Sequence, residues 1–562
     1  MTVPAVAAAL TVLVVVPAVT ALLGAHARNR ARTTSDLLAA SRGVGPVRNA
    51  TAIGGECVCA AVFLGTAGLV LVHGADMLWL PLAATAGHVL LLALVTAPLR
   101  RSGAYTLSDF AEWRLGSCAV RRIVTGCVCF VGWFSLLPQF HGAGVTLRVL
   151  TGAPEEAGWA VVVGAALALA GAGGLRGARF WLKLVAVAVP AVALLAMWRL
   201  DGAPDPAADR LPHFPRDTVV RVSAPAALTV PADVAVTVRG RVDGVRHDGG
   251  GLTLSSGRHT VGKGTELAFP AGAVVPHAER LPVKDGATWA TPFGGAHSHA
   301  LYGTFSALLG VLLGTMGLPH ILTRFYTNTS GAAARRTAAY IPAFLALFSL
   351  FPAVHGMLGR LYTPELLVTG DMDATVLLLP QRMLPGAPGA LLTGLVAAGA
   401  FAAFISTACA IVVAIAGTLS QRMRRGGGVT AFRLCAVLAL AAPLTVVPRI
   451  GAEGAALLLT TALTVSACSL CPLLVLGIWW RGLTAAGAAA GLLAGGGLAV
   501  AAGIVRLLGG AGTGWPAAII GQPALLAVPL AFATMVAVSR GTRPPQAAER
   551  ALARLHLPEK HA

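Results

Sequence analysis

The chain has 562 residues, of which 56% are hydrophobic and only 12% are charged. A soluble domain carries about twice that charged fraction, so an ordinary soluble protein is excluded. The net charge of +19 does not indicate nucleic-acid binding, because the arginines cluster between apolar runs and no basic face with interleaved aromatic residues is present.

Apolar runs of a length that can cross a bilayer recur along almost the whole chain. They predict an all-α polytopic membrane protein with about 13 transmembrane helices, at 3–25, 49–73, 77–98, 120–150, 157–175, 180–199, 298–322, 336–358, 388–419, 430–448, 453–480, 483–507 and 516–538. The first run resembles a signal peptide in length. It lacks a basic start, however, and a basic segment follows it, so we expect a transmembrane helix over 1–27.

Charged residues alternate between the two sides of the predicted bundle. The basic segments are 28–48, 100–122, Arg176 to Lys183, 324–336 and 422–425, and the acidic positions are Asp76, Glu155–Glu156, Asp371–Asp373 and Glu453. Because Lys and Arg concentrate in cytoplasmic loops, this pattern predicts an outside N-terminus and a cytoplasmic tail at 540–562. The scarcity of lysine beside arginine, alanine and glycine indicates a high-GC bacterium, so we expect a bacterial plasma membrane.

One long segment, 201–296, is polar and interrupts the apolar runs. It shows strand-like alternation in TVVRVSAPAALTVPADVAVTVRGRV and LTLSSGRHTV, and Gly249 to Gly251 would form a turn. These features predict a small β-rich extracytoplasmic insertion. Capture of substrate and a merely decorative role both stay open.

The span NATAIGGECVCAAVFLGTAG combines a glycine pair, Gly54-Gly55, with a carboxyl group, Glu56. Glycines weaken a helix, and unwound backbone inside a membrane exposes carbonyl oxygens that suit Na⁺. A glycine-rich packing face would explain the glycines equally well. Glu56 has three open roles: a proton-carrying acid, a counter-charge for an ion, or a structural acceptor of backbone amides.

A second span, GAFAAFISTACAIVVAIAG, carries two adjacent hydroxyls, Ser406 and Thr407. Buried hydroxyls in a membrane need partners. They can line an ion site, or they can donate back to carbonyl groups of their own helix. The residues alone leave both alternatives open.

Five stretches together carry a family resemblance: DLLAASRGVGPVRNATAIGGE (36–56), PLRRSGAYTLSDFAEWRLG (98–116), LLPQFHGAGVTL (136–147), GTMGLPHILTRFYT (314–327) and AFAAFISTACAIVVAIAGTLSQ. They resemble the sodium:solute symporter family, and most closely its cation/acetate (monocarboxylate) branch. The resemblance covers most of the chain except 201–296. It implies a LeuT-type fold, with inverted repeats at 49–200 and 297–480 and two additional helices over 481–539.

The resemblance also implies site residues. A sodium ion would bind the carbonyl oxygens of Gly55, Val58 and Ala403 and the hydroxyls of Ser406 and Thr407. A small substrate would lie beside it, with candidate contacts at Cys59, Ala60, Val62, Phe63, Gln139, Gly142 and Thr304. The branch carries hydroxyl residues at two positions where this chain has Cys59 and Val62, so acetate, propionate and pyruvate all stay open as substrates.

We therefore expect a secondary active transporter that couples a small monocarboxylate to Na⁺ by alternating access. The alternatives are Na⁺- or H⁺-coupled symport of another solute, such as the amino acid proline, and a transporter-like sensor. No nucleophile elbow, phosphate loop or metal-ligand spacing is present in the sequence, so an enzyme is not expected. The expected partners are Na⁺, a small organic anion and the lipid bilayer, with no cofactor, transition metal or obligate protein partner.

Overall fold

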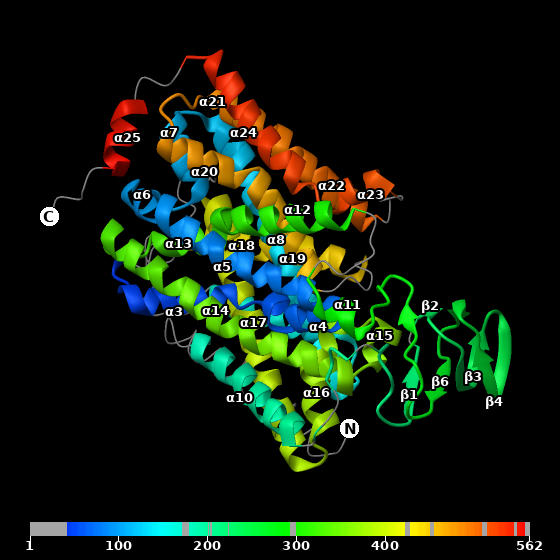
Figure 1. Cartoon of the computed structure of the whole chain (residues 1–562). Coiled ribbons are helices and arrows are strands. Elements are labelled where there is room, and N and C mark those ends of the chain that lie inside the picture. The colour runs from blue at the N-terminus through cyan, green and yellow to red at the C-terminus, as the bar shows by residue number, and fades with distance from the viewer. Residues whose placement is uncertain are drawn as a thin grey trace.

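The computed structural model describes residues 42–556, apart from 171–178, 201, 203–204, 209, 223, 293–298, 422–427, 450–454, 509–513 and 544–547. The helix predicted over 1–27 lies outside the described residues. Figure 1 shows a bundle of helices with a β domain projecting from one end. The C-terminal helix α25 (Ala548–His556) lies at the opposite end of the bundle.

The segment of the first predicted repeat holds ten helical elements. They are α3 (Pro46–Cys57), the π-helical turn η2 (Ala61–Gly65), α4 (Thr66–His73), η3 (Gly74–Leu78), α5 (Trp79–Leu94), α6 (Thr96–Arg101), α7 (Leu107–Leu115), α8 (Cys118–Thr151), α9 (Glu155–Ala170) and α10 (Arg179–Leu200).

The segment after the β domain is also helical. Its elements are α11 (Gly286–Ala290), α12 (Ala300–Gly314), η4 (Thr315–Gly317), α13 (Pro319–Phe325), α14 (Gly331–Tyr362), α15 (Glu365–Thr369), η5 (Met372–Ala374), α16 (Thr375–Met383), α17 (Ala387–Ser420), α18 (Gly428–Val446), η6 (Val447–Arg449), α19 (Ala455–Cys468), α20 (Leu470–Trp479), α21 (Ala485–Gly491), η7 (Leu492–Gly496), α22 (Gly497–Leu507), α23 (Gly514–Gly521) and α24 (Ala524–Arg540).

Within the described residues, nine helices are long and apolar enough to cross a membrane, or up to ten if the bent pair α23 and α24 forms one span. The prediction of about 13 spans exceeds this count for three identifiable reasons. The first predicted span is outside the described residues. The spans predicted at 49–73 and 77–98 meet in one stretch, Ala61–Leu94, and the span predicted at 157–175 is described only as far as Ala170, the last residue of α9 before a gap.

Two helices are broken inside the bundle. The first leaves the helical path at Val58, where φ is −78° and ψ is 81°, and resumes at η2. We expected the break at Gly54-Gly55, but both glycines stay helical and the chain unwinds three residues later. The second break lies between α12 and α13, where Leu318 is extended before Pro319. Each break therefore falls in the first helix of a predicted repeat, where transporters with inverted repeats place discontinuous helices.

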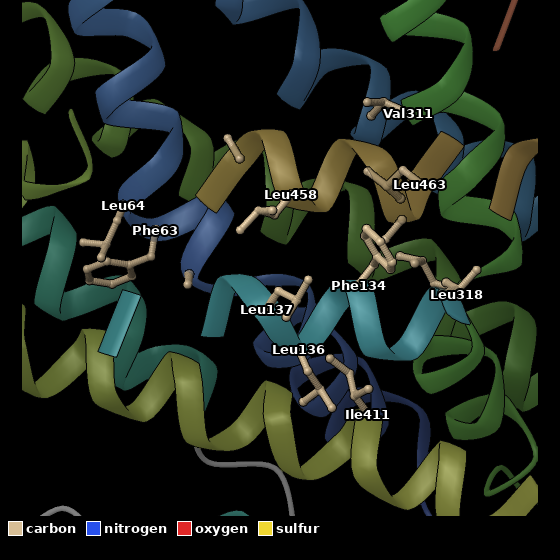
Figure 2. Close-up of a cluster of buried hydrophobic side chains, with 14 of the residues drawn as sticks. Phe63, Leu64, Phe134, Leu136, Leu137, Val311, Leu318, Ile411, Leu458 and Leu463 are labelled. Carbon is tan, nitrogen blue, oxygen red and sulfur yellow. The ribbon is translucent and has the colours of Figure 1, made fainter. Parts of the chain in front are cut away.

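The core of the bundle is formed mainly where η2, α8, α17 and α19 meet. Figure 2 shows side chains from these elements and α12 in one cluster, including Phe63, Phe134, Val311, Ile411 and Leu458. Lipid chains are as apolar as these side chains, so the helices associate by close packing rather than by a hydrophobic driving force.

The β domain confirms the β-rich insertion. Its strands are β1 (Thr218–Arg221), β2 (Ala226–Val230), β3 (Val234–Val242), β4 (Val245–Leu254), β5 (Gly257–Val261), β6 (Glu266–Phe269) and β7 (His277–Ala278). They form one antiparallel sheet in the order β1-β6-β3-β5-β2-β7, and β4 pairs with β3.

The turn predicted at Gly249 to Gly251 was wrong, because these glycines lie inside β4. The chain reverses instead at Asp243-Gly244, where both residues have positive φ (50° and 80°). An Asp-Gly pair between alternating strands is the stronger hairpin signal.

The segment after the sheet fastens the β domain to the helices. The indole nitrogen of Trp289 donates to the carbonyl oxygens of Val70 and Leu71, each at 3.0 Å. The ammonium of Lys284 donates to Asp76 Oδ2 at 2.8 Å and pairs with it. The β domain is thus anchored at the end of α4.

Candidate functional site

The break after α3 exposes backbone carbonyl groups inside the bundle. Residues 58 and 59 leave the helix, so nearby carbonyl oxygens lose the partner that a continuous helix would supply. Gly55 and Val58, both predicted as ion ligands, direct their carbonyl oxygens to one shared point. That point is occupied by a side chain of the protein itself.

The ammonium of Lys183 lies at this point. Lys183 Nζ donates to the carbonyl oxygen of Val58 at 3.1 Å, to Ser406 Oγ at 2.6 Å and to the carbonyl oxygen of Gly55. The side chain is completely buried. An ammonium has three N–H donors, and three acceptors receive them here. Hydrogen bonding of this kind is what allows a charge to be buried.

The pattern of α10 explains why Lys183 faces inward. Phe180, Lys183 and Val187 are all 0% exposed and lie at i, i+3 and i+7, on one face of the helix. The other face carries Trp181 and Val185, which are about half exposed. We had grouped Lys183 with the basic segment starting at Arg176, whereas α10 begins at Arg179 and takes Lys183 into the bundle.

Helix α17 brings the predicted hydroxyls to the same place. Ser406 Oγ donates to the carbonyl oxygen of Ala403 at 3.2 Å, which leaves its lone pairs free to accept from Lys183. Thr407 Oγ1 donates instead to the carbonyl oxygen of Glu56 at 3.1 Å. The adjacent hydroxyls therefore diverge, and each ties α17 to a different partner. Both were predicted as ligands; Ser406 accepts from the buried cation, whereas the hydroxyl of Thr407 donates to the backbone of α3.

A sodium ion does not fit among these oxygens while Lys183 is in place. The carbonyl groups of Gly55 and Val58 and the hydroxyl of Ser406 already accept N–H bonds from the ammonium. Two unit charges about 4 Å apart also repel by roughly 4 kcal/mol at an effective dielectric of 20. Three of the five oxygens predicted for the sodium site, those of Gly55, Val58 and Ser406, thus converge on one point, but the cation among them belongs to the chain.

Glu56 has a partner that we did not predict. Its Oε1 accepts from Arg324 Nε at 2.7 Å and forms an ion pair with the same guanidinium. Glu56 is 4% exposed, and Arg324 comes from α13, just beyond the second helix break. The pair therefore connects the two broken helices. The structural role expected for Glu56 was to accept from backbone amides, whereas its Oε1 accepts from a side-chain guanidinium.

The resumed helix is fixed at its first residue by Gln139 of α8. The backbone N–H of Ala60 donates to Gln139 Oε1 at 3.0 Å, and Gln139 Nε2 donates to the carbonyl oxygen of Ser135. The free N–H groups at the start of a helix carry partial positive charge. The break therefore presents buried carbonyl groups on one side and the positive end of a helix on the other.

An open cavity adjoins the break, with about 940 Å³ of empty space when the adjoining open solvent is included. Three of the predicted substrate contacts line it, namely Cys59, Val62 and Gln139. The other four do not. Ala60 and Phe63 are buried in packing, Gly142 faces Ala60 and Phe404, and Thr304 lies elsewhere on α12.

Several polar residues of this cavity were missing from the predicted contacts. They come from five elements around the break: Thr66, His88, Ser135, His320 and Thr460. His320 follows Pro319 directly, at the start of α13, and the discontinuity at Pro319 could have indicated it. The remaining lining is mostly aliphatic, so the cavity offers few hydrogen bonds.

Comparison with known proteins agrees with this architecture. The model of the sodium:solute symporter family matches residues 37–197 and 287–495, on both sides of the β domain. The uncharacterized symporter YwcA of Bacillus subtilis is 24% identical over 91% of this chain and 90% of its own length. The monocarboxylic acid transporter of Corynebacterium glutamicum is 25% identical over 86% of this chain and 82% of its own.

A solved structure supports the fold. A Na⁺-coupled sialic acid symporter in a substrate-bound, outward-open state aligns with a TM-score of 0.60 and 12% identity, covering 96% of this chain and 98% of the other. At that identity the likeness establishes the LeuT-like arrangement alone. Since the family model covers well over half of the residues, the chain belongs to the sodium:solute symporter family.

Proposed function

We propose that this membrane protein is a secondary active transporter that carries a small monocarboxylate in symport with a cation, by alternating access. The observation that carries the proposal is the cavity beside the first helix break, with Cys59, Val62 and Gln139 on its wall. Transporters of this fold bind their solutes near such breaks, close to the middle of the membrane.

The chemistry of the cavity suits a short carboxylate. The helix that resumes at η2 starts at the cavity wall, and its positive end can offset a carboxylate charge. The largely aliphatic remainder suits a methyl or ethyl group better than a polyhydroxylated sugar, which would leave many hydroxyls unpaired. The relative from Corynebacterium glutamicum, named as a monocarboxylic acid transporter, supports the same class.

In a transporter that works by alternating access, the polar contacts between the two predicted repeats would have a role. Arg324 and Glu56 join α13 to α3, and Ser406 joins α17 to Lys183 of α10. A solute that binds beside these contacts can favour one arrangement of the repeats only through its differential affinity for the two arrangements. The cavity lies beside the first helix break, where a bound solute would contact the two arrangements differently.

Uptake by purified protein in proteoliposomes tests the proposal. Labelled acetate, propionate, pyruvate and proline are supplied in turn, with an inward Na⁺ gradient, an inward H⁺ gradient or neither. We expect concentrative uptake of at least one monocarboxylate under a cation gradient, and competition among the monocarboxylates. Concentrative uptake of proline without any monocarboxylate, or no gradient-driven uptake at all, would contradict the assignment.

A variant pair links the activity to the cavity. Gln139→Ala should raise the KM for the monocarboxylate by roughly tenfold, because it removes the polar group at the start of the resumed helix. Gln421→Ala, at the end of α17 and outside the cavity, is the matched control and should leave KM unchanged. Equal KM values for the two variants would place the substrate elsewhere.

A further inference from the structure

We propose that the ammonium of Lys183 permanently takes the place of a bound sodium ion at the break of the first helix, so that this position binds no Na⁺ in the native protein. The inference concerns one cation position and does not depend on the identity of the transported solute. Any sodium that drives transport binds at other oxygens.

The ammonium of Lys183 matches its surroundings. Lys183 comes from α10, whereas its acceptors come from α3, the unwound residue Val58 and α17. A single buried cation thus joins three separate helices through oxygen atoms. Unwound carbonyl oxygens together with a serine hydroxyl are the ligands that a hard cation such as Na⁺ requires. The ammonium of Lys183, which is attached to α10, donates hydrogen bonds to the same oxygens.

Helix α10 approaches α3 closely. A Cβ atom added to Gly55 would lie 3.4 Å from the backbone nitrogen of Phe180. Lys183 follows Phe180 by three residues, so its side chain starts on the same face of α10 and reaches the carbonyl group of Gly55. The lysine is therefore delivered to the break by packing of the two backbones, not by a flexible loop.

Lys183 excludes a sodium ion from these oxygens. The ammonium uses the oxygens of Gly55, Val58 and Ser406, and the side chain is fully buried. A sodium ion could enter only if Lys183 withdrew from all three. Withdrawal would leave its charge without these partners in an apolar surrounding. The Lys183 ammonium therefore excludes Na⁺ from this position.

Direct binding of radioactive ²²Na⁺ to the purified full-length protein tests the proposal without any transported solute. The informative comparison is the effect of Ser406→Ala in two backgrounds. In the native background, Ser406→Ala should change the dissociation constant for Na⁺ by less than twofold, because no sodium uses that hydroxyl. Weakening of Na⁺ binding by tenfold or more in this background would overturn the proposal.

Removal of the Lys183 side chain should free the oxygens of Gly55, Val58 and Ser406 to bind Na⁺. In Lys183→Ala we expect an additional saturable Na⁺ site, and Lys183→Ala/Ser406→Ala should weaken that site at least tenfold. Leu182→Ala, one residue away and 41% exposed, is the matched control and should bind Na⁺ as the native protein does. If Lys183→Ala does not elute as a monodisperse protein, Lys183→Ser serves as the second opening variant. A folded opening variant without an added Na⁺ site would contradict the proposal.

This test separates the inference from the proposed function. Binding of ²²Na⁺ needs no knowledge of the solute, so failure of monocarboxylate uptake leaves the result intact. Conversely, a sodium ion at Ser406 in the native protein would overturn the inference while leaving monocarboxylate transport standing.

Discussion

The ion pair between Glu56 and Arg324 lies between the two broken helices, and its loss should be costly. Glu56→Gln leaves a largely buried guanidinium without its carboxylate, which destabilises a protein by about 3 kcal/mol. We therefore predict a clear fall in the melting temperature of the purified protein for Glu56→Gln and for Arg324→Gln. In the double variant the fall should be smaller than the sum of the two, because the pair is already absent after one substitution.

The pair Glu279 and Arg258, in the β domain, is a control with the same chemistry at an exposed place. Its N···O distance is 2.9 Å, and the arginine and glutamate side chains are 66% and 47% exposed. Glu279→Gln should lower the melting temperature much less, since exposed pairs contribute at most about 1 kcal/mol. Additive effects of the Glu56 and Arg324 substitutions would show that the two side chains are not coupled.

At the scale of single residues, the sequence predicted the oxygen atoms around the buried cation better than it predicted the cation itself, Lys183. Gly55, Val58 and Ser406 were identified from a resemblance, and they do converge. Lys183 was assigned to a basic loop because it follows Arg176 and Arg179 closely. A single lysine at helical spacing from Phe180 and Val187, in an otherwise apolar run, should have been taken as an intramembrane charge with a function.

At the scale of elements, the contact between α12 and α19 depends on a glycine just before the second break. A Cβ atom at Gly314 would lie 2.2 Å from the carbonyl oxygen of Leu463. Gly314→Ala must therefore push the helices apart, at a cost of about 1–3 kcal/mol. We predict a lower melting temperature and a lower uptake rate for this variant, measured on purified and reconstituted protein.

Gly303, on the same helix, supplies the control. Among the described residues, no atom lies within 4 Å of a Cβ built there, apart from the helix itself and its chain neighbours. Gly303→Ala should keep the native uptake rate and match or exceed the native melting temperature, because alanine favours a helix by about 1 kcal/mol over glycine. Similar losses in both variants would mean that the packing at Gly314 has no special importance.

Helices were easier to predict than their interruptions. Long apolar runs fixed most spans to within a few residues, since about 20 apolar residues in a row have few alternatives to a membrane helix. The first break fell at Val58 and not at the glycine pair, because Gly54 and Gly55 serve close packing against Phe344 and Phe180. The glycine pair therefore identified the helix that is broken but not the residue at which it breaks.

At the scale of the whole molecule, the β domain is a separable addition to the helical bundle. Its ends meet, since the backbone N–H of Val275 donates to the carbonyl oxygen of Pro212 at 2.9 Å. Replacing 213–274 by two glycines would keep the anchor at Trp289. We predict that this deletion leaves the KM for uptake within twofold of the native value, because the cavity lining contains no residue of the sheet.

The control for this deletion is Trp289→Ala, which keeps the sheet but removes two hydrogen bonds to the end of α4. It should lower the melting temperature of the helical part, whereas the deletion should not. A KM raised fivefold or more by the deletion would instead favour the alternative that the β domain captures substrate.

The general architecture could be predicted from the sequence because the apolar runs, and the five stretches that resemble the symporter family, are spread over the whole bundle. The β domain was predicted only as β-rich, since strand alternation such as that of Val234–Val242 gives the buried face but not the pairing order. The placement of Arg324 beside Glu56 could not be predicted, because the two residues are 268 positions apart in the chain and meet only through the packing of the two broken helices.

A high-resolution cryo-EM map of the native protein, purified in sodium buffer, tests the central claim most directly. The account predicts continuous density from α10 to a Lys183 ammonium between the carbonyl groups of Gly55 and Val58 and the hydroxyl of Ser406. A separate ion peak held by these oxygens, with the lysine side chain turned away, would contradict it.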